Sequence, residues 1–83
     1  MYENKIVLIT GTSRGVGLEI TKHFIDNNAI VIGISRGLSE YKHGNYHHYL
    51  LDISDPEAII NCFRKKISKQ FKKIDIVINN AAV

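Results

Sequence analysis

The sequence predicts an α/β fold in which four parallel strands form one sheet with helices on both faces. Near-continuous apolar runs at 5–10, 29–35 and 74–78 are typical of strands that are buried on both faces, as in parallel sheets. Between the strands, apolar residues recur at helical spacing, and strands that alternate with helices indicate a parallel sheet. We expect the strand order 3-2-1-4.

The first helix is expected to follow the first strand after a short glycine-rich stretch. From residue 16 the apolar positions recur every four residues and predict the buried stripe Val16, Ile20 and Phe24. Asn27 and Asn28 are expected to end this helix, because asparagine tolerates the left-handed backbone angles of a helix C-terminus.

The second half of the chain is expected to add two strands and one helix. Residues 36–45 are polar and have room for a turn of helix, but not for a long crossover, before a third strand within 46–54. Ser54 and Glu57 fit a capping box, with Pro56 in the first helical turn. The buried stripe of this helix is expected at Ile59, Phe63, Ile67 and Phe71. The fourth strand then completes the N-terminal portion of a Rossmann fold, up to its switch point.

Length and composition indicate one small domain of an ordinary globular protein, with 83 residues, 45% of them hydrophobic and 23% charged. No apolar run approaches the roughly 20 residues that span a bilayer, and the first residues lack the pattern of a signal peptide. We therefore expect no membrane partner and a cytoplasmic location. The single cysteine, Cys62, excludes an internal disulfide and is expected as a small residue of the core or its boundary.

The charged residues and the histidines do not predict a nucleic-acid site or a metal site. The net charge is +3, and basic side chains crowd residues 64–73, which we interpret as a solvated helix face rather than a nucleic-acid site. His47 and His48 are neighbours on a strand and point to opposite faces, and no cysteine or carboxylate near them completes a ligand set. We expect no metal.

Three glycines stand where the first strand gives way to the first helix. Gly11 would permit a tight turn off the strand, Gly15 would let the backbone approach a pyrophosphate, and Gly17 would let the helix sit close to the sheet. The helix N-terminus there offers free N–H groups and a partial positive charge, which favour anions. Thr12 and Ser13 are expected to add hydroxyl donors along the loop.

The spacing of these glycines resembles the short-chain dehydrogenases/reductases. The segment TGTSRGVG is similar to their cofactor loop and to the form in ketoacyl-carrier-protein reductases, LDISD (51–55) resembles their stretch after strand three, and IDIVINNAA (74–82) resembles their strand-four motif. The resemblance runs from residue 5 to residue 83. Ala82 departs from the glycine that is usual in the strand-four motif.

The resemblance implies a dinucleotide cofactor and a small carbonyl or alcohol substrate. It implies that Asp52 and Ile53 lie at the adenine, and that Asn79 and Ala81 border the adenosine ribose and the nicotinamide side. The cofactor loop that it implies comprises Gly11, Thr12, Ser13, Arg14, Gly15, Val16 and Gly17.

The end of the second strand predicts which dinucleotide is bound. An NAD site places a carboxylate there for the ribose 2′-hydroxyl, whereas this sequence has Ser35 and Arg36. A guanidinium pairs with a 2′-phosphate through two hydrogen bonds. The resemblance implies that Arg14 approaches the same phosphate. We therefore expect NADP(H), with NAD(H) as the alternative.

The catalytic residues of such a reductase are not found in these 83 residues. The family uses a tyrosine with a lysine four residues later, and none of the four tyrosines has that lysine. We name no catalytic residue and expect a partial dinucleotide-binding domain over 1–83, without the catalytic half. The chain could be a fragment of a full reductase, a small protein that closes its sheet in a homo-oligomer or with a partner, or a binding module such as a redox sensor. A methyltransferase is a weaker alternative.

Overall fold

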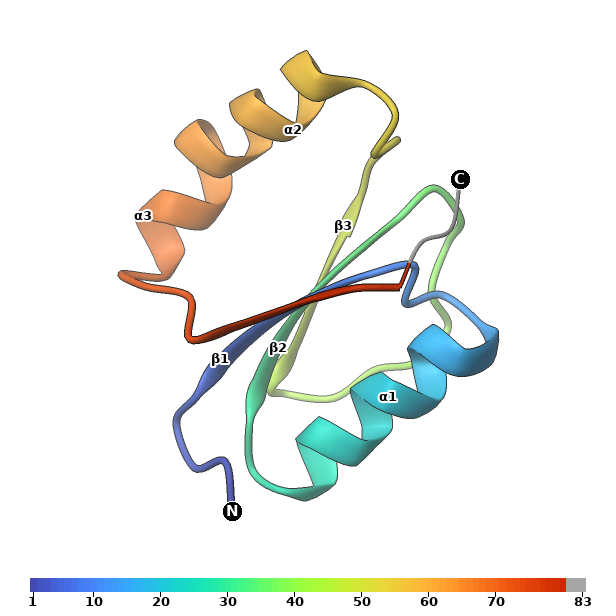
Figure 1. The fold of residues 1–83 in the computed structure, drawn as a ribbon, viewed down its shortest axis with the longest axis vertical. Coiled ribbons are helices and arrows are strands. Elements are labelled where there is room, and N and C mark those ends of the chain that lie inside the picture. Colours follow the sequence, from blue (N-terminus) through green and yellow to red (C-terminus); the bar gives the residue numbers. More distant parts are fainter. Residues whose placement is uncertain (81–83) are drawn as a thin grey trace.

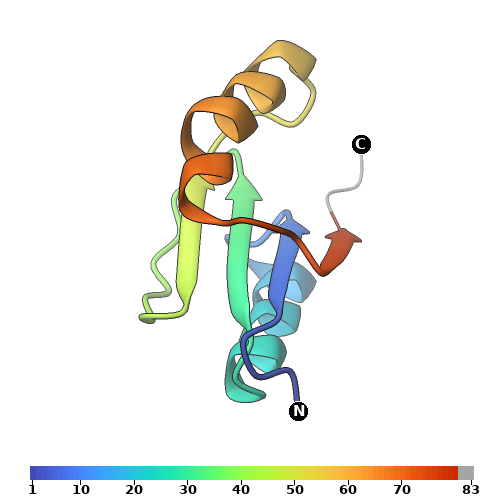
Figure 2. The ribbon, with the colours of Figure 1, turned by 90° about the vertical axis from the view of Figure 1, so that its left-hand side faces the viewer.

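The computed structural model describes residues 1–80 as one parallel sheet with helices on both faces (Figure 1). In chain order its elements are β1 (Ile6–Thr10), α1 (Gly15–Asp26), β2 (Ile30–Ser35), β3 (Tyr46–Leu50), α2 (Pro56–Cys62), the π-helical segment η1 (Phe63–Ile67), α3 (Ser68–Gln70) and β4 (Ile76–Asn79). The sheet has the order β3-β2-β1-β4, which confirms the predicted strand order (Figure 2).

Two apolar clusters hold the helices against opposite faces of the sheet (Figure 1). Successive strand residues point to opposite faces, so Val7 and Ile9 of β1 face α1 whereas Leu8 faces η1. The cluster under α1 also contains Phe24, Ile25, Ala29, Val31 and Tyr46, and the cluster under η1 contains Ile32, Ile34, Cys62 and Ile67. Burial on both faces explains why β1 and β2 are nearly continuous apolar runs.

Helix α1 ends at the two asparagines that the sequence singles out. Asn28 has φ +71°. Its N–H donates to the carbonyl of Ile25 at 3.0 Å, and the N–H of Ala29 donates to the carbonyl of Phe24 at 3.0 Å. This pair of bonds is a Schellman motif, which uses a left-handed residue to satisfy the last helical carbonyls.

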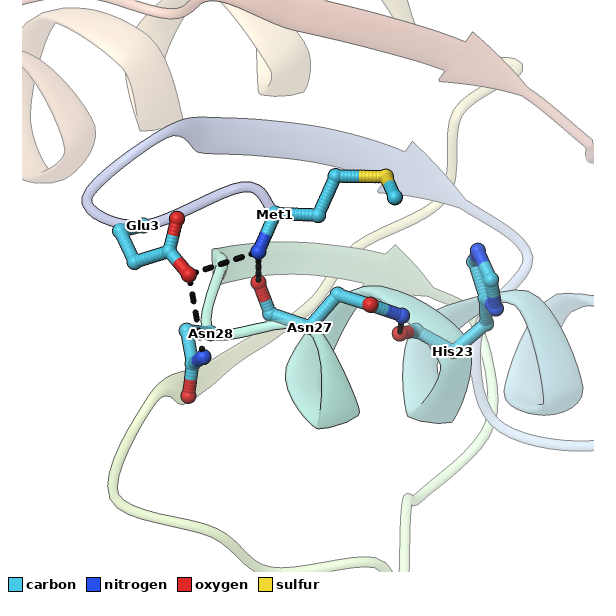
Figure 3. Close-up of polar contacts among 5 residues, drawn as sticks. All are labelled: Met1, Glu3, His23, Asn27 and Asn28. Atoms are coloured by element: carbon cyan, nitrogen blue, oxygen red, sulfur yellow. Dashed lines mark hydrogen bonds and ion pairs between the residues drawn. The ribbon is translucent and has the colours of Figure 1, made fainter.

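The N-terminal segment is bound to the same helix end (Figure 3). The α-amino group of Met1 lies 2.6 Å from Oε1 of Glu3, and Nδ2 of Asn28 donates to the same oxygen at 3.3 Å. The hydrogen bond from the amino group, with those from the backbone and Asn28, lowers the pKa of Glu3 to about 2. Nδ2 of Asn27 donates to the carbonyl of His23 at 2.8 Å.

Two predicted helix details are wrong by about one residue. Val16 is 69% exposed instead of buried, because the neighbouring Gly17 faces the sheet and each residue turns the helix by about 100°. The second helix is capped by Asp55, whose Oδ1 accepts from the N–H of Ala58 at 3.2 Å. Ser54, the predicted cap, instead donates its hydroxyl to Asp52 at 2.7 Å.

The stripe of the second helix is confirmed in part. Ile67 is buried, and Ile59 and Phe63 are half-buried. Phe71 lies beyond the end of α3, where its ring packs edge-on against His47 with the centroids 5.1 Å apart. The π-helical segment η1 has no counterpart in the prediction.

The connection between β2 and β3 contains no helix within residues 36–45, where the prediction left room for a turn of one. Side-chain packing holds this segment instead. The ring of Tyr41 lies 5.4 Å from the ring of Tyr46, and Nζ of Lys22 on α1 lies 5.8 Å from the centre of the Tyr41 ring. Tyr41 thereby connects the loop to the cluster under α1.

Asp75 joins the start of β4 to the start of β1. Its Oδ2 accepts from the N–H of Ile6 at 2.8 Å, its own N–H donates to the carbonyl of Ile6 at 2.8 Å, and Nζ of Lys73 lies 3.3 Å from Oδ1. The hydrogen bond from Ile6 is the main cause of the lowered pKa of Asp75.

We expect Asp75→Asn to destabilise the fold at neutral pH but not in acid. A carboxyl group with a lowered pKa stabilises the folded chain above its unfolded pKa of about 4, and this contribution is lost as the pH falls through the folded pKa. Thermal melts from pH 7 to pH 2 should show a difference in Tm that shrinks with acidification. Glu40→Gln, which alters an exposed loop carboxylate, is the control, and a pH-independent difference would contradict the assignment.

Candidate functional site: the glycine loop and the carboxyl edge of the sheet

The segments that follow β1, β2, β3 and β4 meet at the carboxyl edge of the sheet. In parallel α/β sheets, ligands bind at this edge where the strand order reverses. Here the order reverses between β1 and β4, because β2 and β3 lie on one side of β1 and β4 on the other. The glycine loop stands at this point.

The loop needs glycine at two positions for its backbone angles. Gly11 has φ +71° and Gly15 has φ +62°, values that side chains rarely permit. The N–H of Gly11 donates to the carbonyl of Ile34 at 2.7 Å, which fixes the turn against β2 as the chain leaves β1. Nothing lies within 4 Å of the space where a Cβ of Gly15 would stand, so that position faces open space.

Gly17 is required for a different reason, the close approach of α1 to the loop. A Cβ at this position would overlap the carbonyl oxygen of Gly11 and would stand 2.6 Å from Nδ2 of Asn80. The first turn of α1 therefore rests directly on the backbone of the loop. The sequence predicts a glycine here for close packing of the helix on the sheet, and the atoms that a side chain would meet belong to Gly11 of the loop and to Asn80 after β4.

The N-terminus of α1 is left open to an anion. Arg14 is the N-cap residue, with extended φ −160° and ψ 173°, and no side chain of residues 1–80 caps the helix. The first turn of α1 contains no acidic residue. No carboxylate of the helix therefore offsets the positive end of the helix dipole or accepts from its free N–H groups. Exposed Val16 stands in this first turn.

Thr12 and Ser13 of the loop differ in their burial. Thr12 is fully buried, and its Oγ1 accepts from the hydroxyl of Tyr46 at 2.9 Å. The sequence predicts Thr12 as a hydroxyl donor along the loop, whereas the buried Thr12 faces the interior and holds the loop to β3. Ser13 is half-buried, and its Oγ would lie 3.3 Å from a Cβ at Gly37.

The backbones of Ser13 and Gly37 are thus close together, and their sequence neighbours include the two predicted arginines. Arg14 follows Ser13 and Arg36 precedes Gly37, and both arginines are exposed. Neither arginine forms an ion pair with any residue from 1 to 80. The positive charge of Arg36 also reaches Asp52 and contributes to its lowered pKa.

Ser35 at the end of β2 is 5% exposed and bonded within the protein. Its Oγ donates to the carbonyl of Gly37 at 2.8 Å and lies 2.6 Å from Nε2 of His48 on β3. The sequence predicts Ser35 as a cofactor residue but gives no sign of His48, because the two are brought together only by the pairing of β2 with β3.

Asp52 follows β3 and forms a turn rather than an ion pair. Its Oδ1 accepts from the N–H of Ser54 at 2.9 Å and from the hydroxyl of Ser54 at 2.7 Å. These two hydrogen bonds are the main causes of its lowered pKa. Asp52 is exposed, while the neighbouring Ile53 packs against the cluster under η1.

The two asparagines after β4 connect that strand to β1 and its loop. Oδ1 of Asn79 accepts from the hydroxyl of Thr10 at 2.9 Å. Nδ2 of Asn80 donates to the carbonyl of Gly11 at 3.2 Å, and its N–H donates to Oγ1 of Thr10 at 3.1 Å. The site predicted from the sequence omits Asn80, although its position directly after Asn79 at the end of β4 is a reason to include it. Ala81, which is predicted to border the cofactor, lies outside the described residues.

Within residues 1–80, the structure contains no group of three or more side chains arranged to hold a metal ion. No helix in the same part of the chain is long and apolar enough to cross a bilayer.

The sheet order and the glycine turn define a Rossmann-type α/β protein. A sequence model of the family described as short chain dehydrogenase matches residues 5–83. The chain therefore belongs to the short-chain dehydrogenase family of oxidoreductases, as the motifs predict.

Individual relatives agree with this family. The chain is 35% identical, over 99% of its length, to the 3-oxoacyl-acyl-carrier-protein reductase FabG of Escherichia coli, of which it covers 36%. It thus spans about a third of the length of the curated relatives that it matches.

Solved structures include relatives with different cofactors. A short chain dehydrogenase of Leptospira borgpetersenii with bound NAD+ superimposes with a TM-score of 0.89 at 27% identity, over 99% of this chain and 33% of that one. A variant of ElxO with NADPH bound superimposes with a TM-score of 0.79 at 33% identity, over 96% of this chain and 36% of that one.

Proposed function

We propose that this chain provides the cofactor-binding portion of an NADP-dependent oxidoreductase that moves hydride between nicotinamide and a carbonyl or alcohol substrate. The observation that carries the proposal is the closeness of the glycine loop to the turn after β2, where a Cβ at Gly37 would lie 3.3 Å from Oγ of Ser13 and where Arg14 and Arg36 are the adjacent residues in sequence. Both arginines are exposed and form no ion pair within residues 1–80, and Arg14 is the N-cap residue of α1, which no side chain caps.

Each part of the dinucleotide has a matching feature at this edge. The pyrophosphate would accept hydrogen bonds from the N–H groups of the first turn of α1, where Gly15 leaves open space. The 2′-phosphate would pair with Arg14 and Arg36. The adenine would lie near Asp52 and Ile53, and the nicotinamide side would lie beyond β4, at Asn79 and Ala81.

The choice between NADP(H) and NAD(H) depends on this chain's own residues, since one relative above is bound to NAD+ and another to NADPH. A carboxylate at the end of β2 would accept from a ribose 2′-hydroxyl and repel a 2′-phosphate. Ser35 and Arg36 occupy that end here. A charge-assisted hydrogen bond contributes about 1.5–3 kcal/mol, so we expect NADPH to bind roughly tenfold to a hundredfold more tightly than NADH.

The bound nicotinamide would supply the hydride chemistry, while this chain's residues would bind and orient the dinucleotide. In this family a tyrosine, with a lysine four residues later, activates the substrate, and residues 1–83 do not contain that pair. The reaction, its substrate, a homo-oligomeric state and a cytoplasmic location are thus proposals about the whole protein. The buried, unpaired Cys62 is compatible with a reducing compartment.

Separate fluorescence or calorimetric titrations of the chain with NADPH and NADH test the proposal. We expect the dissociation constant of NADPH to be at least about tenfold lower than that of NADH. Equal affinities, or tighter binding of NADH, would refute the NADP assignment. Failure to bind either dinucleotide would refute the cofactor site altogether.

A further inference from the structure

His48 on β3 contacts the end of β2 through one short hydrogen bond. Its Nε2 lies 2.6 Å from Oγ of Ser35, whose hydroxyl also donates to the carbonyl of Gly37 at 2.8 Å. A serine hydroxyl has a single hydrogen. Since Gly37 receives that hydrogen, Nε2 of His48 must carry its own and donate it to Ser35.

The two bonds link His48 to the turn that contains Arg36. The bond from Ser35 to Gly37 spans Arg36 and fixes the backbone on both sides of it. Gly37 in turn is near Ser13 of the glycine loop, since a Cβ at Gly37 would lie 3.3 Å from Oγ of Ser13. The position of the Arg36 backbone relative to the loop therefore depends on a chain of contacts that begins at His48.

The surroundings of His48 favour this arrangement. The imidazole is half-buried, with its ring centre 6.0 Å from that of Tyr46, and burial lowers the pKa of His48. The ring is thus neutral near pH 7 and has one N–H. Tyr46 is itself fixed by its bond to Thr12, so the ring of His48 is packed against a part of the molecule that already supports the glycine loop.

We propose that His48 is a positioning residue for recognition of the 2′-phosphate, because it holds the Ser35–Gly37 turn that presents Arg36 beside the glycine loop. This inference rests on the proposed function. It also changes the role predicted for Ser35. The hydroxyl of Ser35 donates its hydrogen to the carbonyl of Gly37, so Ser35 cannot donate a hydrogen bond to the 2′-phosphate. Discrimination between NADPH and NADH therefore depends on Arg14 and Arg36.

Substitutions of His48 distinguish a residue that positions Arg36 from a residue that only stabilises the fold. We expect His48→Phe to raise the dissociation constant of NADPH about tenfold and that of NADH less than about twofold, because only the 2′-phosphate needs the Arg36 turn. His48→Gln, whose amide N–H can reach the same oxygen, should restore at least half of the lost discrimination. The same selective loss should appear with 2′,5′-ADP compared with 5′-AMP, which isolates the 2′-phosphate.

His47→Phe is the matched control. His47 is the next residue along β3, and its ring contacts Phe71 while its Nδ1 lies 3.4 Å from Nε2 of Gln70. Substitution there should leave the ratio of the two dissociation constants unchanged. Circular dichroism and Tm of each variant establish that the chain is folded.

Ser35→Ala tests the same contact from its other side if His48→Phe does not fold. Because it removes the bonds to both His48 and Gly37, it should reduce discrimination at least to the same extent, and adding His48→Gln to it should cause no further loss. The inference is overturned if His48→Phe leaves the NADPH-to-NADH ratio unchanged, or if it weakens both dinucleotides equally. A wild-type chain that binds NADPH and NADH equally would instead refute the proposed NADP preference, which is a separate result.

Discussion

Gly17→Ala is expected to lower the free energy of unfolding by about 3 kcal/mol and to abolish dinucleotide binding, at the upper end of what overpacking costs in proteins. The added methyl group would overlap the carbonyl oxygen of Gly11, which is backbone and cannot rotate away. Gly11 is held in turn by the bond from its N–H to Ile34 at 2.7 Å. Helix α1 must therefore move away from the loop, and its first N–H groups move with it.

Urea or thermal unfolding and an NADPH titration measure both effects. Gly44→Ala is the control for a glycine-to-alanine change, because nothing lies within 4 Å of the added Cβ. Gly15→Ala should fall between them: its Cβ meets no atom, but φ +62° costs a side chain about 1–2 kcal/mol. A Gly17→Ala chain with unchanged stability and affinity would show that α1 does not rest on the loop as described.

Removal of both arginines at the loop junction is expected to remove the preference for NADPH. Arg14→Gln and Arg36→Gln together should raise the dissociation constant of NADPH by about a hundredfold and that of NADH by less than about threefold, if each guanidinium contributes one charge-assisted bond of about 1.5 kcal/mol. Each single variant should lose about tenfold. Both side chains are exposed, so stability should change little.

The salt dependence of binding provides a second measurement. The affinity of the wild-type chain for NADPH should fall more steeply with salt than that of the double variant, since exposed charges are screened. Arg64→Gln removes an exposed arginine from η1, away from the glycine loop, and should leave both affinities unchanged. Equal losses for NADPH and NADH in the double variant would mean that the arginines contact the shared pyrophosphate instead.

The strand order could be predicted because buried apolar runs alternate with helical segments, a pattern that leaves few sheet topologies, and the turn at the glycines could be predicted because it is a local feature of the sequence. Continuous apolar runs such as that of β1 are expected only where both faces of a strand are covered, and the structure buries Val7, Leu8 and Ile9 in alternate clusters. The tight turn predicted at Gly11 is formed with φ +71°, and Gly15 in the same loop has φ +62°.

The interior contacts of the site could not be predicted in this way. The hydroxyl of Tyr46 reaches Thr12 past Gly33 of the intervening strand, where a Cβ would stand 2.8 Å from it. His48 meets Ser35 because of the parallel register of β2 and β3. Both contacts depend on residues that are distant in sequence, and no periodicity or motif refers to them.

The pairing of β1 with β4 also affects the order in which the fold can form. Asp75 and Ile6 are 69 residues apart, yet they exchange hydrogen bonds at the start of the two strands. During synthesis, β1 can pair with β2 after about 35 residues but lacks its other neighbour until residues 76–79 have left the ribosome. Contacts of such long separation slow folding, because the intervening chain must be ordered first. The carbonyl of Gly11 likewise lacks the hydrogen bond from Asn80 until then, so the loop that would hold the cofactor is complete only after β4 has emerged.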